Sequence, residues 1–197
     1  KLFMLGNEAV ALGALTSGAK FMSAYPITPS SEIMEYMVKY APAEGGVMLQ
    51  TEDEISACTM AIGAAYAGAR AFTATAGPGL SLMAEAIGLA EMTETPLVVI
   101  DTQRGGPSTG LPTKHEQSDL MAAIYNTHGD TAKIVISPSS IEESFYDTFE
   151  AFNLAEEYQC PVIVLSDLQL SLGKQSVTSL DYGKLQVRRG KLVKDGL

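Results

Sequence analysis

The pattern that most constrains the fold is a regular alternation of short apolar, β-rich runs with longer segments of helical periodicity. The clearest run is Leu97–Asp101, in which four consecutive apolar residues end in a carboxylate. Continuous apolar runs are typical of strands that are buried on both faces, and strands that alternate with helices build parallel sheets. The sequence therefore predicts an α/β fold with a doubly wound, mostly parallel sheet and helices on both faces.

The same pattern places the individual elements. The expected strands are 21–25, 47–50, 71–75, 97–101, 133–136 and 162–166. We expect Asn7 and Glu8 to cap the first helix and Ser31 to cap the second, because side-chain acceptors satisfy the free N–H groups of a first turn. After Leu172 the pattern weakens. We therefore expect one α/β domain over residues 1–172, and a linker or the start of a second domain over 173–197.

Composition narrows the classes of function. The net charge of −10 argues against a nucleic-acid partner, since phosphate contacts need Lys and Arg. The basic residues that follow Gly183 are interpreted as a solvated, partly ordered end. No apolar run approaches the roughly 20 residues that span a bilayer, so no membrane partner is expected.

The two cysteines, Cys58 and Cys160, match no metal spacing and are too few for an iron–sulfur cluster, which needs about four ligands. We therefore expect no metal site on this chain. A disulfide framework is also not expected, and this cysteine usage indicates a cytoplasmic protein.

Two loops that follow expected strands carry chemically distinctive residues, and doubly wound folds bind ligands at such loops. In the first, Pro26 and Pro29 flank Thr28 and hold its hydroxyl in a set direction; a rigid turn before a helix is the other interpretation. In the second, Arg104 follows the strand Leu97–Asp101. Its guanidinium could bind a substrate carboxylate or form a salt bridge with one of the chain's many acids.

Glu52, Asp53 and Glu54 open an expected helix. Carboxylates in a first turn commonly serve the helix dipole, and that explanation holds for at least one of the three. Glu54 differs because small residues follow it, so that a backbone or a flat ring could pack very close. These are Ala57, Ala61, Gly63, Ala64, Ala67 and Gly68. In dry surroundings Glu54 could hold or share a proton.

Taken together, these segments resemble the alpha subunit of the 2-oxoacid:ferredoxin oxidoreductases, most closely the 2-oxoglutarate type. The matching stretches are Gly6–Ala9, Tyr25–Glu32, Glu52–Gly68, Thr75–Met83, Arg104–Leu120, His128–Asp130 and Pro161–Asp167. They occur in the family's order through about residue 170. The resemblance implies the pyrimidine-binding domain for thiamine diphosphate.

The resemblance also implies roles for single residues. Glu54 matches the glutamate that hydrogen-bonds the aminopyrimidine ring of the cofactor and takes part in proton transfer, and Pro26 would lie beside the cofactor. Thr28 and Thr113 match hydroxyls on the substrate side. Arg104 matches the arginine that binds the carboxylate of the 2-oxo acid.

One part of the thiamine signature is missing from this chain. The Gly-Asp-Gly…Asn motif for Mg²⁺ and pyrophosphate has only a false counterpart, Gly129-Asp130-Thr131 followed by Asn153 inside an expected helix. The resemblance therefore implies that thiamine diphosphate is shared with a beta subunit that carries the Mg²⁺ and pyrophosphate site. It places the iron–sulfur clusters on partner chains, with gamma and ferredoxin-like delta subunits as further partners.

The expected function is oxidative decarboxylation of a 2-oxo acid to acyl-CoA and CO₂, with electrons passed to ferredoxin, and only with partner subunits present. 2-Oxoglutarate is the first candidate substrate, although Arg104 would bind the carboxylate beside the ketone of any 2-oxo acid. Two alternatives stay open: the pyrimidine-binding component of another thiamine enzyme, and a non-catalytic α/β assembly module whose Gly/Pro loops serve subunit contacts.

Overall fold

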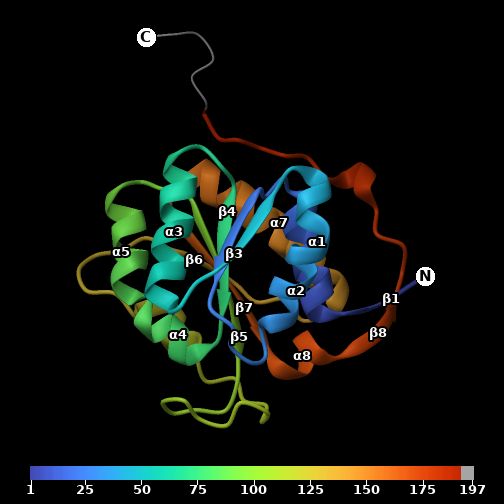
Figure 1. The fold of residues 1–197 in the computed structure, drawn as a ribbon, viewed down its shortest axis with the longest axis horizontal. Helices are drawn as coiled ribbons and strands as arrows, with labels where there is room; N and C mark the ends of the chain where they lie inside the picture. The colour runs from blue at the N-terminus through green and yellow to red at the C-terminus, as the bar shows by residue number, and fades with distance from the viewer. Residues whose placement is uncertain (192–197) are drawn as a thin grey trace.

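The structure is a computed structural model that describes residues 1–191. Its centre is a six-stranded sheet in the order β3-β2-β4-β5-β7-β6 (Figure 1). The strands are β2 (Phe21–Ala24), β3 (Val47–Gln50), β4 (Ala71–Thr75), β5 (Leu97–Gln103), β6 (Ile134–Ile136) and β7 (Pro161–Asp167). All neighbouring strands run parallel, so the predicted doubly wound α/β fold is confirmed.

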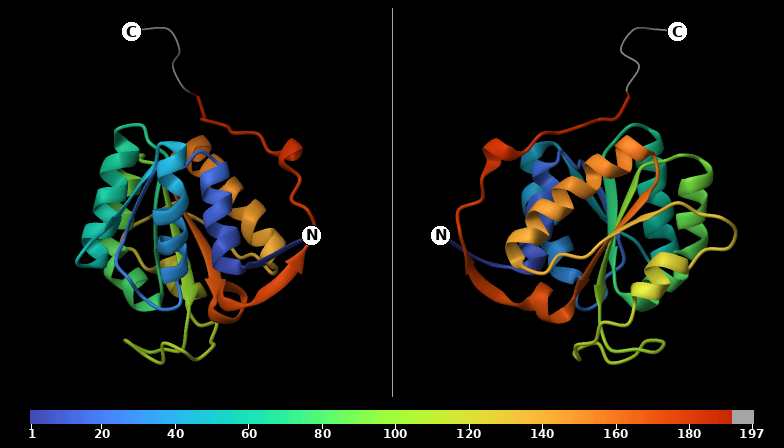
Figure 2. Two further views of the ribbon diagram at one scale, coloured as in Figure 1. Left: turned by 45° about the vertical axis from the view of Figure 1, so that its right-hand side comes forward. Right: turned by 180° about the vertical axis from the view of Figure 1, so that it is seen from behind.

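Helices cover both faces of this sheet (Figures 1 and 2). One face carries α1 (Gly6–Thr16), α2 (Ser31–Tyr40) and α7 (Ile141–Tyr158). The other carries α3 (Glu54–Tyr66), α4 (Gly77–Leu82), α5 (Ala84–Met92) and α6 (Leu120–Tyr125). Among the described residues, no helix combines the length and the apolar character that a membrane span requires.

Side chains of β5 alternate between the two faces, as strand geometry dictates. Val98 and Ile100 pack into the core beneath α1, α2 and α7, whereas Leu97 and Val99 pack into the core beneath α3 to α6. Asp101 continues the second set, and its register partner Leu165 on β7 belongs to the same core. The carboxyl group of Asp101 therefore faces the α3 to α6 layer.

A second, two-stranded antiparallel sheet pairs β1 (Leu2–Leu5) with β8 (Lys174–Val177), which follows the short helix α8 (Leu168–Leu172). It closes a third apolar cluster against α1 and α7. Neither strand was predicted from the sequence, because each has four residues and its partner lies at the other end of the chain. The boundary at residue 172 stays a prediction, and residues 192–197 of the expected linker lie outside the described residues.

Two predicted helix caps differ in the structure. Asn7 lies inside the first turn of α1, is buried, and donates through Nδ2 to the carbonyl oxygen of Pro29 at 2.6 Å and to Oε2 of Glu32 at 3.0 Å. The residue at the cap position of α2 is Ser30, and Ser31 is the first helical residue. Asn7 therefore holds the loop after β2. The Glu8 carboxylate does cap the start of α1, as predicted, by accepting the N–H of Leu5 at 2.9 Å, whereas no side-chain cap forms at the start of α2.

Candidate active site

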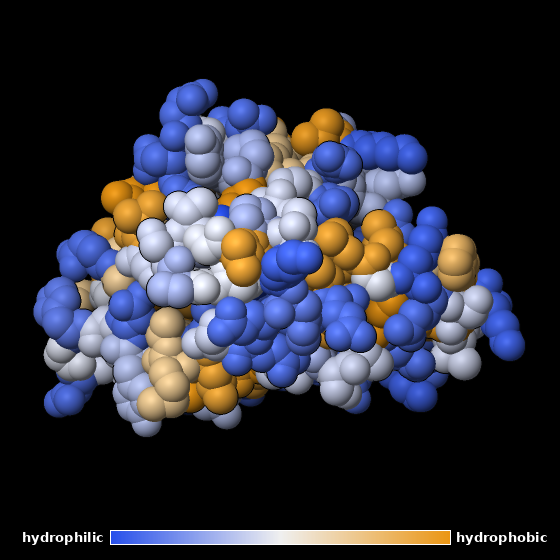
Figure 3. All heavy atoms as spheres, turned by 90° about the horizontal axis from the view of Figure 1, so that it is seen from below, coloured by the Kyte–Doolittle hydropathy of each residue, from blue (hydrophilic) through white to orange (hydrophobic). Residues whose placement is uncertain are grey.

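The carboxyl ends of the parallel strands meet at one edge of the sheet, at the lower side of Figure 1. A cleft of about 710 Å³ opens there, between the start of α4 and the loop that follows β5. Figure 3 views the molecule from this side and shows apolar side chains in several separate groups among hydrophilic ones. This is the edge at which doubly wound sheets bind ligands.

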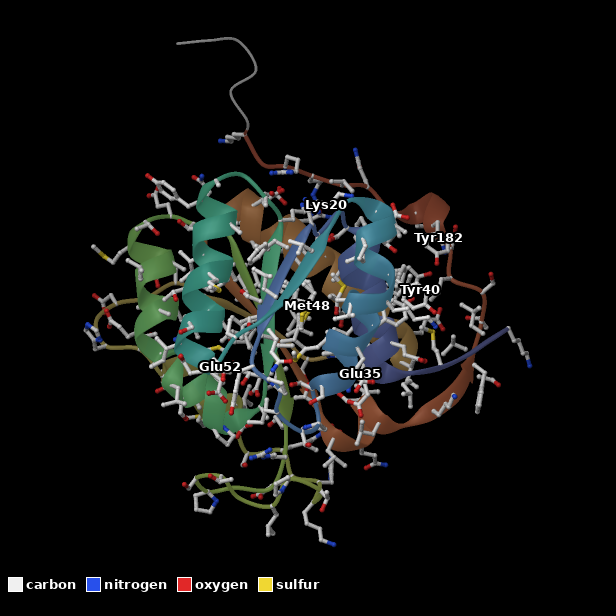
Figure 4. The ribbon with its side chains drawn as sticks, viewed as in Figure 1. Lys20, Glu35, Tyr40, Met48, Glu52 and Tyr182 are labelled. Atoms are coloured by element: carbon white, nitrogen blue, oxygen red, sulfur yellow. The ribbon has the colours of Figure 1, made fainter. Side chains whose placement is uncertain are left out.

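Glu54 lies at the first position of α3, near this edge. The N-cap residue Asp53 accepts the backbone N–H of Ser56 at 2.8 Å, which fixes where the helix starts. Glu54 is only 8% exposed, whereas Glu52, labelled in Figure 4, is exposed. The carboxyl group packs against α4: a methyl group on Gly79 would lie 2.7 Å from Cγ and 3.1 Å from Oε1 of Glu54. Glycine at position 79 therefore leaves the carboxyl its place.

The small residues of α3 fall into two groups. Ala57 and Ala61 are fully buried, and the carbonyl of Ala57 accepts the hydroxyl of Ser23 on β2 at 2.6 Å. Gly63 and Ala67 are exposed, with open space around the position of a Gly63 side chain. The first group lets α3 approach the sheet closely, and the second lies on the outer surface.

Arg104 connects the loops around the cleft. It is 5% exposed, and its Nη1 and Nη2 donate to the backbone carbonyls of Thr28 at 2.7 Å and Thr109 at 2.6 Å. Burial lowers the pKa of Arg104, and the nearby negative charge of Glu54 opposes that shift, so the guanidinium keeps its charge. No ion pair among residues 1–191 includes Arg104, so the salt-bridge interpretation is wrong.

The other predicted site residues are Thr28 and Pro26 in the loop after β2 and Thr113 in the loop after β5. Thr28 is exposed, and its carbonyl is the acceptor for Arg104. Pro26 is exposed and lines a second hollow of about 440 Å³ between β3 and α2. Thr113 is exposed in the loop after β5, outside the residues that line the cleft. Arg104 is thus linked to Thr28 by a hydrogen bond and lies within range of the Glu54 charge, whereas neither Pro26 nor Thr113 makes a hydrogen bond to Arg104 within residues 1–191.

The loop after β5 is closed by its own hydrogen bonds, which were not predicted from the sequence. Leu111 donates its N–H to the carbonyl of Gly105 at 2.8 Å, and the Glu116 carboxylate accepts the N–H of Gly106 at 3.0 Å. Gly110 has φ +62°, and a side chain there would meet the Gly105 carbonyl at 1.9 Å. Glycine is therefore required at position 110, and the loop presents Arg104 from a defined scaffold.

Two further carboxyl groups, one behind the cleft and one lining it, were not predicted as site residues. Asp101 is fully buried at the end of β5, and Asp119 precedes α6 with its side chain against Gly77. Burial raises the pKa of Asp101 well above its usual range, and the charge of Asp119 raises it further. The available signal was the carboxylate that ends the apolar run Leu97–Asp101. Across residues 1–191, no group of three or more His, Cys, Asp or Glu side chains is arranged to hold a metal ion.

Fold and site together define a class of protein: an α/β ligand-binding domain that presents a buried acid and a buried cation at the carboxyl edge of its sheet. Residues 12–195 match the family model described as "Pyruvate flavodoxin/ferredoxin oxidoreductase, thiamine diP-bdg". The chain belongs to this family of thiamine diphosphate-binding domains.

Similar proteins agree with this assignment and confirm the resemblance predicted from the sequence. The chain is 52% identical to the 2-oxoglutarate synthase subunit KorA of Methanothermobacter marburgensis, over 96% of this chain and 50% of that protein. It is 46% identical to the subunit of the same name from Archaeoglobus fulgidus, over 97% of this chain and 56% of the relative.

A solved structure is also similar: the 2-oxoglutarate:ferredoxin oxidoreductase from Magnetococcus marinus with 2-oxoglutarate, coenzyme A and succinyl-CoA bound. It superposes with a TM-score of 0.96 at 48% identity, over 98% of this chain and 34% of that one. The chain thus spans about half the length of the curated relatives it matches.

Proposed function

We propose that this chain is the pyrimidine-binding domain of the alpha subunit of a 2-oxoacid:ferredoxin oxidoreductase. The reaction converts a 2-oxo acid, coenzyme A and oxidised ferredoxin into acyl-CoA, CO₂ and reduced ferredoxin. The observation that carries the proposal is the buried Glu54 carboxyl close to the charged Arg104 at the ligand-binding edge of the sheet. Relatives named for 2-oxoglutarate support that 2-oxo acid as the substrate.

The residues present fit the aminopyrimidine end of thiamine diphosphate. Glu54 is buried, and Gly79 places no side chain over its carboxyl group. A buried carboxyl needs a hydrogen-bonding partner, and a ring nitrogen supplies one. When bound, thiamine diphosphate supplies the carbanion-stabilising chemistry that decarboxylation of a 2-oxo acid requires.

The chain's own contribution is placement and one proton. Glu54 would exchange a proton at a carboxyl oxygen with the ring nitrogen beside it. Arg104 uses two of its five N–H donors on the carbonyls of Thr28 and Thr109, so the remaining donors are fixed in place for a substrate carboxylate. The hydroxyls of Thr28 and Thr113, both exposed, donate hydrogen bonds on the substrate side. Pro26 borders the cofactor.

Other chains supply the rest of the catalytic machinery in this proposal. A beta subunit carries Mg²⁺ and the pyrophosphate site, and iron–sulfur clusters reside on partner chains that include gamma and ferredoxin-like delta subunits. Both cysteines of this chain are buried and free, and two thiols are too few to hold a cluster. Free thiols also suit the reducing cytoplasm, where we place the complex.

The test is reconstitution with the beta subunit and assay of ferredoxin reduction with 2-oxoglutarate, pyruvate and branched-chain 2-oxo acids. Glu54→Gln should lower kcat by about 10²- to 10⁴-fold with little change in the KM for the 2-oxo acid. Arg104→Lys should mainly raise that KM, because the forked guanidinium is lost.

Three results would contradict the proposal. Full activity of Glu54→Gln would remove Glu54 from the mechanism. Reduction of NAD in place of ferredoxin would indicate another thiamine enzyme. An Arg104→Ala variant that changes subunit association but not substrate affinity would indicate an assembly module.

A further inference from the structure

Asp101 is a buried acid that the proposed mechanism does not use. It has no exposed surface, it faces the α3 to α6 layer beside its register partner Thr75 on β4, and neither carboxyl oxygen has a hydrogen-bond partner within residues 1–191. An ionised carboxylate in such a place would be strongly penalised, so the group keeps its proton. A neutral carboxyl has one O–H, which needs an acceptor.

Asp119 is the acid whose negative charge acts on Asp101. Its backbone N–H donates to Oε1 of Gln103 at 3.0 Å, which fixes the residue beside the end of β5. Its Oδ2 is buried and has no hydrogen-bond partner in the part of the chain that the structure describes. Burial raises the pKa of Asp119, and the charge of Glu116 adds to this shift. Asp119 therefore offers a buried, unpartnered acceptor oxygen beside the end of the strand that carries Asp101.

Asp119 contacts the first turn of α4, and the same turn packs against Glu54. A methyl group on Gly77 would lie 2.7 Å from Oδ2 of Asp119 and 3.0 Å from its Oδ1, so backbone and carboxyl are in direct contact. Two residues further on, Gly79 is in the same close contact with Glu54. Displacement of Asp119 would therefore be transmitted through one short segment of backbone to Glu54.

We propose that Asp101 and Asp119 form a buried carboxyl pair that holds one proton, and that this pair positions the Gly77–Gly79 turn against Glu54. The pair itself is independent of the proposed function, whereas its effect on catalysis rests on that function. Loss of the shared proton leaves a negative charge on each of the two carboxylates. Their repulsion moves Asp119 away from Asp101 and displaces the first turn of α4 that Asp119 contacts. Asp101 and Asp119 are positioning residues in this arrangement.

The surrounding elements offer no competing neutralising group in residues 1–191. Their charged and titratable side chains are Glu54, Cys58 and Tyr66 on α3, Glu85 and Glu91 on α5, Tyr125 on α6, Arg104, Lys114, His115 and Glu116 in the loop after β5, and Asp167 at the end of β7. Arg104 already donates to two backbone carbonyls, and Asp167 accepts from Gln117 and pairs with His115. No ion pair of the described residues includes Asp101 or Asp119.

Infrared difference spectroscopy of the 197-residue chain tests the shared proton directly. The carbonyl stretch of a protonated carboxyl should be present in the wild type at neutral pH and lost in Asp101→Asn. Glu85→Gln, which changes an exposed acid on α5, should leave the band unchanged. In Asp119→Asn, the band should disappear at a lower pH than in the wild type, because the second negative charge is gone. A missing band in the wild type, or a band whose titration ignores Asp119→Asn, overturns the pair.

Kinetics of the assembled complex test the positioning role. Asp101→Leu should lower kcat about tenfold or more while the KM for the 2-oxo acid stays unchanged, since the reacting geometry is lost but the substrate site is not. Asp101→Asn keeps a neutral donor and should lower kcat less than Asp101→Leu. Equal kcat values for the wild type and Asp101→Leu would refute the positioning role. A wild-type complex inactive toward every 2-oxo acid would refute the proposed function, while the infrared result would still decide the pair.

Discussion

Replacing Gly79 with alanine is the sharpest test of how the site is built. The new methyl group would lie 2.0 Å from Oγ1 of Thr75 and 2.7 Å from Cγ of Glu54, both side chains being buried. Alanine is favoured over glycine in a helix by about 0.5–1 kcal/mol, whereas overpacking costs about 1–3 kcal/mol. Because the shorter distance is far below van der Waals contact with a rigid β-branched residue, the upper part of that range applies. We expect Gly79→Ala to lower the free energy of unfolding by about 2 kcal/mol.

Urea unfolding of the chain, followed by circular dichroism, measures this difference, and Gly88→Ala is the matched control. Gly88 lies in α5 with open space around its side-chain position, so alanine should stabilise the chain there by about 0.5–1 kcal/mol. Adding Thr75→Ala to Gly79→Ala should give a favourable coupling in a double-mutant cycle. In the assembled complex, displacement of Glu54 should lower kcat on the order of 10²-fold. If Gly79→Ala unfolds at the same urea concentration as Gly88→Ala, the turn does not pack as described.

Three further predictions concern the rest of the molecule. Arg70→Met should cost about 3 kcal/mol in urea unfolding, because it removes the buried partner of Glu156, and adding Glu156→Gln should recover part of the loss. Burial raises the pKa of Cys58 to about 12 and also raises that of Cys160, so mass spectrometry should find both thiols unalkylated by iodoacetamide at pH 8 until the chain unfolds; labelling of the folded chain would contradict this. Hydrogen bonds from the first turn of α3 lower the pKa of Asp53, so its stabilising contribution is present above the unfolded value of about 3.9 and is lost as pH falls below it. Asp53→Asn should weaken that acid dependence in thermal melts, and an unchanged dependence would exclude this source.

The main sheet was predictable because local sequence determines each of its strands. Val47–Gln50 and Leu97–Gln103 are short runs between helical segments, and that alternation alone implies parallel pairing. Leu2–Leu5 and Lys174–Val177 have no such context, because their antiparallel pairing depends on bringing the two ends of the chain together. The residue pattern along the chain therefore does not predict that contact.

The basic end of the chain shows the same limit. We interpreted its cations as solvated, but Arg188 binds Glu150 and also pairs with Glu157 at 3.2 Å, and Arg189 pairs with Glu156 at 2.8 Å. On α7, Glu150 lies more than a turn before the adjacent residues Glu156 and Glu157, so the pairing of all three depends on where the returning segment runs (Figure 2). A charge run therefore indicates which residues can pair, but only the tertiary path decides whether they do.

At the candidate site, sequence reasoning found the groups but not their arrangement. Glu54 was recognisable as a helix-start acid followed by small residues, and it is buried as that context suggested. Arg104 was recognisable as a cation after a buried strand. The hydrogen bond from Arg104 to the carbonyl of Thr28, 76 positions away, was not predictable. Every residue has a backbone carbonyl, so the sequence does not indicate which one a guanidinium will bind.

The separation of the two buried charges is what makes this arrangement suited to a ligand. Glu54 and Arg104 are close enough for the acid to affect the pKa of the cation, yet no ion pair in the described residues joins them. A direct salt bridge would occupy the donors and acceptors that a ligand needs. The carbonyls of Thr28 and Thr109 prevent this by holding the guanidinium in place, while Gly79 holds the carboxyl from the other side. Buried charges kept apart in this way cost stability, which is expected where a site is built to bind a ring and a carboxylate at the same time.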